Sequence, residues 1–341
     1  EDEGYRNYIC GENGILKKWL RCGIAGYRLD VADELPDIFL DDLRKSVKSE
    51  NENAIIIGEV WEDASTKQGG CGRRKYTDGR ELDGVMNYVF AGAVISFLTG
   101  KQDAEALCLA LTALRQNYPK PFYDSCLTML SSHDTVRLLT VLAGAPDRRS
   151  VSREVQAHFV PEESRLNTAK KLMTLAQLIQ LTHPGIPCIY YGDEAGVCGF
   201  TDPDNRRTYP WGHEDQMMIA FHRDMIKIHK EYDFLSNGSL VFLWNDYQGL
   251  CFGRFSHDER MIVILNNRNE DREVEIEVWK TGISRLKDSV LKRIMLSYRD
   301  GYTTEEYEYT AKVGVIRVPM PAFGAMVLYH KCENPTIFVE D

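Results

Sequence analysis

Three acidic side chains follow short apolar runs of the sequence and are the strongest candidates for chemistry. The first run ends in Arg28-Leu29-Asp30. Arg28 and Asp30 are two positions apart, so both side chains project to the same side of a strand. A guanidinium beside a carboxylate stabilises the ionised form that a nucleophile requires. The same pattern also fits an ordinary structural pair between Arg28 and Asp30.

The second candidate is Glu59, which follows three isoleucines and a glycine and precedes Trp61 by two positions. Glutamate is uncommon inside a buried sheet unless it is paired or functional. Apolar surroundings and nearby carboxylates, which we expect around Glu59, are typical of a general acid. The alternative is a strand-end glutamate that meets solvent or caps the next helix. Trp61 fits either stacking on a sugar or a place in the core.

The third candidate is the His133-Asp134 pair, which directly follows the apolar run at 126–130. A histidine and an aspartate at a strand end can bind sugar hydroxyls, or the aspartate can cap the next helix. No second histidine or cysteine stands at ligand spacing from His133, so no metal site is predicted there.

Taken together, the three segments indicate glycoside chemistry. Two carboxylates on either side of a sugar ring make a retaining glycosidase, with one as nucleophile and the other as acid/base. We expect Asp30 and Glu59 to lie roughly 5 to 5.5 Å apart, as that mechanism requires. Asp134 would then bind ring hydroxyls and favour the planar transition state.

The elements that must position these side chains alternate between strands and helices. Strands are expected at 24–31, 54–60, 84–89, 126–130 and 186–190, and helical spacing recurs around 38–47, 107–114 and 172–179. Such alternation predicts parallel βα units with helices outside the sheet, and sites at the carboxyl ends of the strands. The polar stretch 143–164 is expected to be a long loop or short irregular helices.

The pattern changes after about Ser236. Short strands are expected at 263–265, 274–278, 294–296, 315–318 and 325–328, with turn residues between them and no strong helix. We therefore predict two domains, an α/β part at 1–235 and an antiparallel β-sandwich at 236–341.

The composition of the chain excludes some classes of partner and indicates a cellular compartment. The 341 residues carry a net charge of −10, which argues against nucleic acid as the main partner. No run of eighteen apolar residues occurs, so no membrane span is expected. The nine cysteines are odd in number and form no close C-x-x-C pair. They predict free thiols in a reducing compartment, the cytoplasm.

The three segments resemble conserved regions of the α-amylase superfamily of glycoside hydrolases. Gly-Tyr-Arg-Leu-Asp, ending at Asp30, is similar to the motif that ends the fourth barrel strand of that family. The run around Glu59 resembles the acid/base motif on the fifth strand, and Ser-His-Asp, ending at Asp134, the motif on the seventh. The runs at 185–194 and 202–207 resemble the eighth strand and the loop after it.

The resemblance implies a role for each matched residue. Asp30 would be the nucleophile, Glu59 the acid/base and Asp134 the transition-state stabiliser. Two further side chains would support them, with Arg28 orienting Asp30 and His133 binding the sugar in the cleaved subsite. The neighbouring sugar on the non-reducing side would be bound by two residues for which only the resemblance argues: Asp202 and Arg206.

Within the superfamily, the run after Asp30 is most similar to the neopullulanase, cyclomaltodextrinase and maltogenic amylase group, although Asp33 stands where that group has asparagine. The resemblance implies hydrolysis of α-1,4 bonds, with α-1,6 bonds as a further target, in maltodextrins, cyclodextrins, pullulan or starch, together with transglycosylation. Two alternatives stay open: an α-1,6 glucosidase or debranching enzyme, and a non-catalytic glycan-binding protein on the same fold.

The resemblance also implies what else the enzyme needs. No cofactor is required; calcium is compatible, but Glu34 stands where many α-amylases carry a calcium-ligating histidine, and no ligands can be identified in this segment. A (β/α)8 TIM barrel has eight βα units, and five are expected here, corresponding to strands four to eight. We therefore expect residues 1–341 to be the C-terminal portion of a longer enzyme, partnered by its missing N-terminal half. A homodimer is compatible with this.

Overall fold

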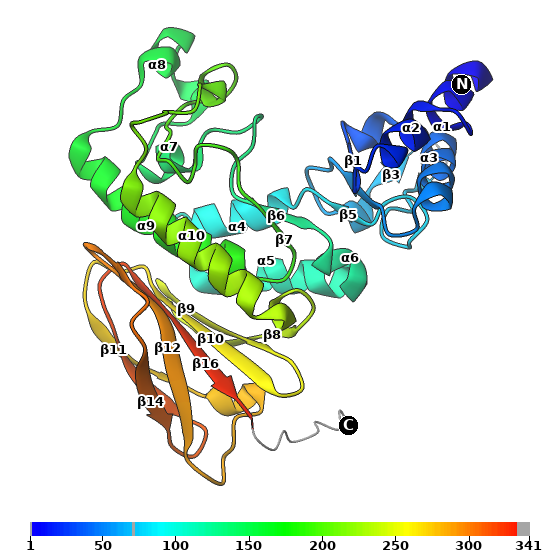
Figure 1. The fold of residues 1–341 in the computed structure, drawn as a ribbon. Coiled ribbons are helices and arrows are strands. Elements are labelled where there is room, and N and C mark those ends of the chain that lie inside the picture. The colour runs from blue at the N-terminus through cyan, green and yellow to red at the C-terminus, as the bar shows by residue number, and fades with distance from the viewer. Residues whose placement is uncertain (1, 70–71, 333–341) are drawn as a thin grey trace. The chain divides into compact units, whose positions relative to one another are not determined.

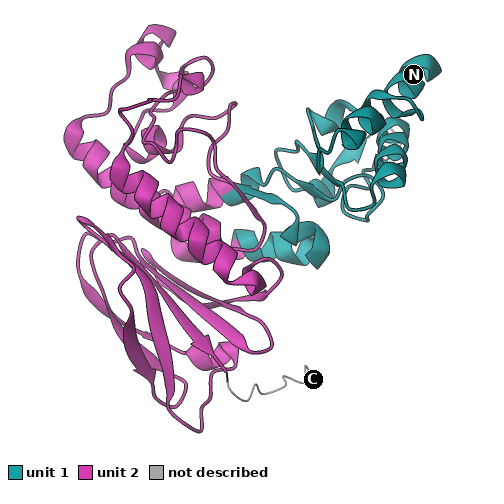
Figure 2. Ribbon diagram, viewed as in Figure 1, with its two compact units in different colours: residues 1–90, 110–128 teal, residues 91–109, 129–341 magenta. Residues whose placement is uncertain are grey.

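The computed structural model describes residues 2–69 and 72–332. The chain divides into two compact units, drawn in different colours in Figure 2. Unit 1 comprises residues 1–90 and 110–128, and unit 2 comprises residues 91–109 and 129–341. Three elements cross the boundary between the units: α4 (Tyr88–Leu98), α5 (Ala104–Asn117) and β6 (Leu127–Met129).

A three-stranded parallel sheet forms the centre of unit 1. Its order is β1 (Gly26–Leu29), β2 (Ile55–Gly58) and β5 (Gly84–Val85). Met86 extends it by a parallel bridge to Leu127. Strands β2 and β5 are apolar and almost wholly buried, as expected of parallel strands that are covered on both faces, whereas β1 contains Tyr27 and Arg28 and is only partly buried. The parallel pairing agrees with the βα alternation expected from the sequence.

Helices surround this sheet. The longest helix that lies wholly in unit 1, α3 (Asp37–Glu50), begins after Pro36 and buries one stripe formed by Leu40, Leu43 and Val47. Such a stripe at helical spacing is the usual way in which a helix covers a sheet. The unit also contains α1 (Glu3–Cys10), α2 (Ile15–Arg21), α6 (Lys120–Asp124) and a small hairpin of β3 (Gln68–Gly69) and β4 (Gly72–Arg73).

The expected strand at 84–89 is wrong at its end. β5 stops at Val85, and α4 begins at Tyr88. The Asn87 side chain accepts a hydrogen bond from the backbone N–H of Phe90 at 2.9 Å. Asparagine in this place satisfies an otherwise unpaired donor at the start of a helix, so the helix begins earlier than the apolar run suggests.

Long helices and a large sheet make up unit 2. Helices α9 (Glu163–Thr182) and α10 (Gln216–Glu231) contact each other, and α9 also contacts the large sheet (Figure 1). Residues 143–162 hold only short helices, one of them α8 (Arg153–His158), as expected, whereas the last two residues of the expected loop, 163 and 164, already belong to α9. Two further elements of this part of the chain are α7 (Leu138–Leu142) and β7 (Ile186–Cys188).

The C-terminal part is rich in sheet. The strands are β8 (Ser239–Asn245), β9 (Gly249–Phe255), β10 (Glu259–Asn266), β11 (Arg272–Ile276), β12 (Ser289–Tyr298), β13 (Gly301–Thr303), β14 (Tyr307–Ala311), β15 (Ile316–Met320) and β16 (Gly324–Lys331). They form two antiparallel sheets. The larger sheet has the order β13-β12-β16-β10-β9-β8, with β14 paired to β12, and the smaller sheet pairs β11 with β15. Apolar residues from both sheets form one core, among them Ile264, Met326, Ile276 and Val318.

Eight cysteines are free, and the ninth, Cys71, lies outside the described residues. None of the helices in the described ranges has the length and apolar character needed to cross a membrane.

Candidate active site

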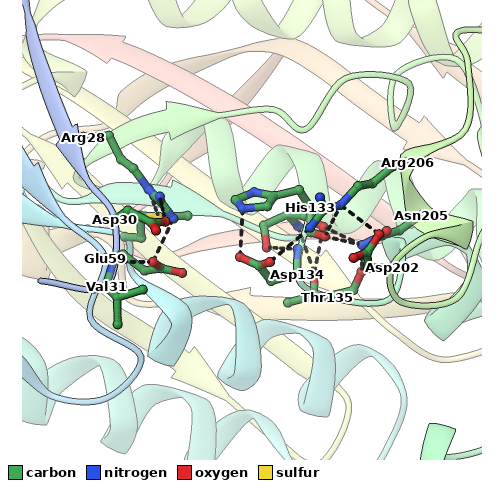
Figure 3. A network of polar contacts seen from close by, with 12 residues as sticks. Arg28, Asp30, Val31, Glu59, His133, Asp134, Thr135, Asp202, Asn205 and Arg206 are labelled. Atoms are coloured by element: carbon green, nitrogen blue, oxygen red, sulfur yellow. Dashed lines mark hydrogen bonds and ion pairs between the residues drawn. The ribbon is translucent and has the colours of Figure 1, made fainter. Parts of the chain in front are cut away.

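Arg28 joins the first two candidate carboxylates in unit 1 (Figure 3). Its Nη1 donates to Oδ1 of Asp30 at 2.5 Å, and its Nη2 lies 3.0 Å from Oε2 of Glu59. Its Nε also faces Sδ of Met86 at 3.4 Å. One guanidinium therefore binds both carboxylates, as its planar array of donors allows.

The register of β1 and β2 explains this meeting. Leu29 pairs with Gly58, so the residues after each strand, Asp30 and Glu59, leave the sheet side by side. The Glu59 N–H donates to the Leu29 carbonyl at 2.9 Å, which extends the pairing by one residue. A side chain at Gly58 would displace a neighbour, because a Cβ there would lie 2.5 Å from Cδ1 of the buried Leu82.

Glu59 and Asp30 have different surroundings. The Glu59 side chain is 5% exposed, whereas that of Asp30 is 77% exposed. Oε2 of Glu59 also accepts a hydrogen bond from the backbone N–H of Val31 at 2.8 Å. The buried carboxylate therefore turns back toward the chain that follows Asp30, where Arg28 and the Val31 amide compensate its charge.

Trp61 is a half-exposed aromatic side chain that stacks on Tyr88. The ring centroids are 4.0 Å apart and the planes differ by 10°. Trp61 keeps 45% of its surface exposed, so its stacking on Tyr88 leaves much of it open to another group. Such an exposed flat ring is suited to packing against the apolar face of a sugar.

The other expected site residues come together in unit 2. His133 Nε2 lies 3.0 Å from Oδ2 of Asp134, and Arg206 Nη2 lies 3.5 Å from Oδ1 of the same carboxylate. Arg206 Nε also lies 3.3 Å from Oδ1 of Asp202 (Figure 3). The loop after β7 thus contributes a cation that joins the two acidic side chains, Asp202 and Asp134.

Buried polar residues that the sequence did not single out support this cluster. Asn205 is fully buried, and its side-chain amide donates to the carbonyls of His133 at 2.7 Å and Thr135 at 2.8 Å. Arg137 is also fully buried and donates to the Asn205 carbonyl at 2.8 Å. Asn205 stands inside the run at 202–207, but only the folded chain shows which carbonyls it reaches.

Asp193 is the counterion of Arg137. Its Oδ1 lies 3.2 Å from Nη1 of Arg137, and its Oδ2 accepts from the Ser131 hydroxyl. Burial raises the pKa of Asp193 to about 6, although Ser131 and Arg137 both act to lower it. Asp193 belongs to the run at 185–194, where its acidic character alone did not distinguish it from a surface residue.

The carboxylates of the predicted site are thus divided between the units, with Asp30 and Glu59 in unit 1 and Asp134 in unit 2. Within the described ranges, no group of three or more histidine, cysteine, aspartate or glutamate side chains is arranged to hold a metal ion.

Similarity to known proteins agrees with the motifs. Residues 1–237 match the family model for the alpha amylase catalytic domain. Neopullulanase 2 of Thermoactinomyces vulgaris is 32% identical over 321 residues, covering 93% of this chain and 47% of that protein. An amylopullulanase of Thermoanaerobacter thermohydrosulfuricus is 32% identical over 334 residues, covering 90% of this chain and 21% of that protein.

Solved structures extend the similarity to the fold. The debranching enzyme of Nostoc punctiforme matches with a TM-score of 0.73 and 28% identity, over 96% of this chain and 62% of that one. The chain spans less than half the length of the two curated relatives named above. Because the family model covers more than half of the residues, and the segments around Asp30, Glu59 and Asp134 lie within it, this chain belongs to the alpha-amylase family.

Proposed function

We propose that the chain carries the catalytic carboxylates of a retaining glycoside hydrolase. Its substrates would be α-1,4-linked glucans such as maltodextrins, cyclodextrins, pullulan or starch, with α-1,6 bonds as a further target. The observation that carries the proposal is the binding of Asp30 and Glu59 by one guanidinium, that of Arg28. A single guanidinium spans two carboxylates only when they are close, which favours the short separation of retaining enzymes.

Each carboxylate has surroundings that suit its proposed role. Glu59 is buried and would protonate the leaving oxygen, while the exposed Asp30 attacks the anomeric carbon. The bond to the leaving sugar breaks as the bond to Asp30 forms. Glu59 then takes a proton from water, which releases the glucose unit from Asp30, or from a sugar hydroxyl, which gives transglycosylation.

The residues of unit 2 would act on the sugar ring. Asp134 would stabilise the positive charge that develops in the transition state, and His133 would bind a hydroxyl in the cleaved subsite. Asp202 and Arg206 would bind the neighbouring sugar, and Trp61 of unit 1 would offer an aromatic face. This chemistry requires no organic or redox cofactor.

The proposed site also implies an architecture. We propose that β1, β2, β5, β6 and β7 are the fourth to eighth strands of a (β/α)8 barrel. Five strands cannot close such a barrel, so activity would need three further βα units. These would come from the rest of a longer protein or from a separate chain. The free thiols of the described cysteines support a reducing compartment such as the cytoplasm.

A second candidate is an enzyme selective for α-1,6 bonds. The names of the similar amylopullulanase and debranching enzyme favour it. The non-catalytic alternative has less support, because Asp30, Glu59 and Asp134 are all present and the first two share Arg28.

Product analysis tests the proposal. The full-length protein is incubated with maltohexaose, a cyclodextrin and pullulan, and the products are followed by chromatography and by NMR of the new reducing end. We expect short maltooligosaccharides that first appear as the α-anomer. Cleavage of pullulan at its α-1,6 bonds alone would select the second candidate. An initial β-anomer would show inversion, and the absence of products from all three would leave a glycan-binding protein.

A further inference from the structure

A buried amide binds the carbonyl groups of the residues on both sides of Asp134. The Asn205 side chain donates to the carbonyl of the preceding residue, His133, at 2.7 Å and to that of the following residue, Thr135, at 2.8 Å. A longer contact of 3.3 Å reaches the Ser132 carbonyl. These contacts of the Asn205 side chain all go to the backbone that sets the direction of Asp134, and not to the Asp134 side chain.

Asn205 is itself held by a second buried layer. Nε of Arg137 donates to the Asn205 carbonyl at 2.8 Å, and Nη1 of Arg137 donates to the Tyr191 carbonyl. The Arg137 guanidinium lies over the Tyr190 ring, with 4.3 Å between its central carbon and the ring centroid. Asp193 balances the charge of Arg137 at 3.2 Å.

These contacts run between two loops. Arg137 follows Asp134 by three residues, whereas Asp193 and Asn205 belong to the segment after β7. Arg206, next to Asn205, approaches Asp134 from the solvent side, since its side chain is 44% exposed. The exposed arginine meets the Asp134 carboxylate, and the buried asparagine fixes the backbone beneath it.

We propose that Asn205 is a positioning residue for Asp134, and that the Arg137–Asp193 pair keeps Asn205 in place. The inference rests on the proposed function, in which Asp134 stabilises the transition state. Asn205 would touch neither the substrate nor the reacting atoms. Its loss would let the Asp134 carboxylate shift, and a shift of about 1 Å in a catalytic group costs on the order of a hundredfold in rate.

The variant Asn205→Ala tests this in the full-length enzyme with maltohexaose as substrate. An interaction that matters mainly in the transition state lowers kcat and leaves KM nearly unchanged. We expect kcat per folded molecule to fall about a hundredfold, with KM within about threefold of the wild type. A kcat within about threefold of the wild type would overturn the inference.

Asn266→Ala is the matched control. Asn266 is also fully buried, and its amide donates to two carbonyls, those of Glu270 and Pro321, both at 2.9 Å. Its removal should lower Tm to an extent similar to that of Asn205→Ala while kcat stays at the wild-type level. An equal loss of kcat in both variants would show that the effect of Asn205 is merely structural.

Two further measurements keep the outcomes distinct. If Asn205→Ala does not fold, Asn205→Ser, which keeps one donor, should show a smaller loss of kcat in the same direction, and wild-type kcat would again refute the inference. The wild-type enzyme is assayed first. If it releases no sugar from any glucan, the proposed function fails, whereas an active wild type with an equally active Asn205→Ala variant refutes the positioning role alone.

Discussion

The backbone N–H of Val31 donates to Oε2 of Glu59 at 2.8 Å. Val31, the residue that follows Asp30, thereby holds the carboxylate of Glu59, which is proposed to act together with Asp30. Val31 adopts φ 42° and ψ 58°, in the left-handed region, which a β-branched residue rarely occupies. Strain of this kind costs on the order of 1 kcal/mol or more and persists where the surrounding contacts fix the backbone. Here it occurs beside the candidate catalytic groups.

Replacement of the proposed nucleophile gives the first prediction. Asp30→Asn in the full-length enzyme should lower kcat for maltohexaose at least about a thousandfold, because the amide cannot form the glycosyl ester. Asp78→Asn, an exposed aspartate of the same unit, should leave kcat within about twofold of the wild type. Near-normal turnover by Asp30→Asn would eliminate Asp30 as the nucleophile.

The role of Glu59 can be tested with two substrates that differ in whether their leaving group needs a proton. Glu59→Gln should lose at least about a thousandfold in activity on maltohexaose, whose leaving oxygen needs a proton. α-Glucosyl fluoride does not need that proton. With this substrate the variant should release a burst of one fluoride ion per enzyme molecule. Only the second step, hydrolysis of the glycosyl ester on Asp30, then lacks its base. Stopped-flow detection of fluoride measures the first step. Added azide replaces the activated water, so its effect on the rate measures the second step.

The control for this prediction is Glu62→Gln, a nearby exposed glutamate that pairs with Lys67. It should hydrolyse both substrates at nearly the wild-type rate. Equal losses of Glu59→Gln activity on maltohexaose and on the fluoride, with no burst, would mean that Glu59 is not the proton donor.

Some of this site follows from local sequence alone. The period of two in a strand predicted that Arg28 and Asp30 share a side, and the structure joins them at 2.5 Å. The apolar run before Glu59 predicted a strand at 54–60, and β2 ends at Gly58, directly before Glu59. Both inferences depend only on neighbouring positions, which is why they could be made before the fold was known.

Other parts depend on contacts between distant segments. Asn205 and Thr135 are 70 positions apart, and nothing in either local pattern indicates their hydrogen bond. The apolar run at 84–89 predicts too long a strand, because Asn87 caps a helix that begins within that run. Strand β9 was not predicted either, since two glycines and Arg254 interrupt its apolar pattern. Strand β8 was missed although residues 240–244 form a continuous apolar run.

A buried carboxyl group near the start of α3 leads to a prediction about pH. Glu81 is fully buried, and its Oε2 accepts from the Lys75 N–H at 3.1 Å. Oε1 has no hydrogen-bond partner among the described residues. Burial, and next the charge of Asp37, raise the pKa of Glu81 to about 7, while Arg74 acts in the opposite direction.

The direction of the pH effect follows from this raised pKa. Between about pH 4.5, where the unfolded chain loses this proton, and about pH 7, the folded state binds more protons than the unfolded state. The free energy of unfolding should therefore fall as the pH rises through that window. At 1.36 kcal/mol per pKa unit the loss is at most roughly 3 kcal/mol.

Glu81→Gln removes the titrating group but keeps its shape. Urea unfolding at pH 5, 6, 7 and 8 should then show a smaller decline than in the wild type, and at pH 8 the variant should be more stable by about 1 to 2 kcal/mol, because no charge is buried. Glu52→Gln, at an exposed glutamate of the same unit, should keep the wild-type slope. A Glu81→Gln variant that is less stable than the wild type at pH 8 would show that Glu81 is held as a carboxylate that the fold requires.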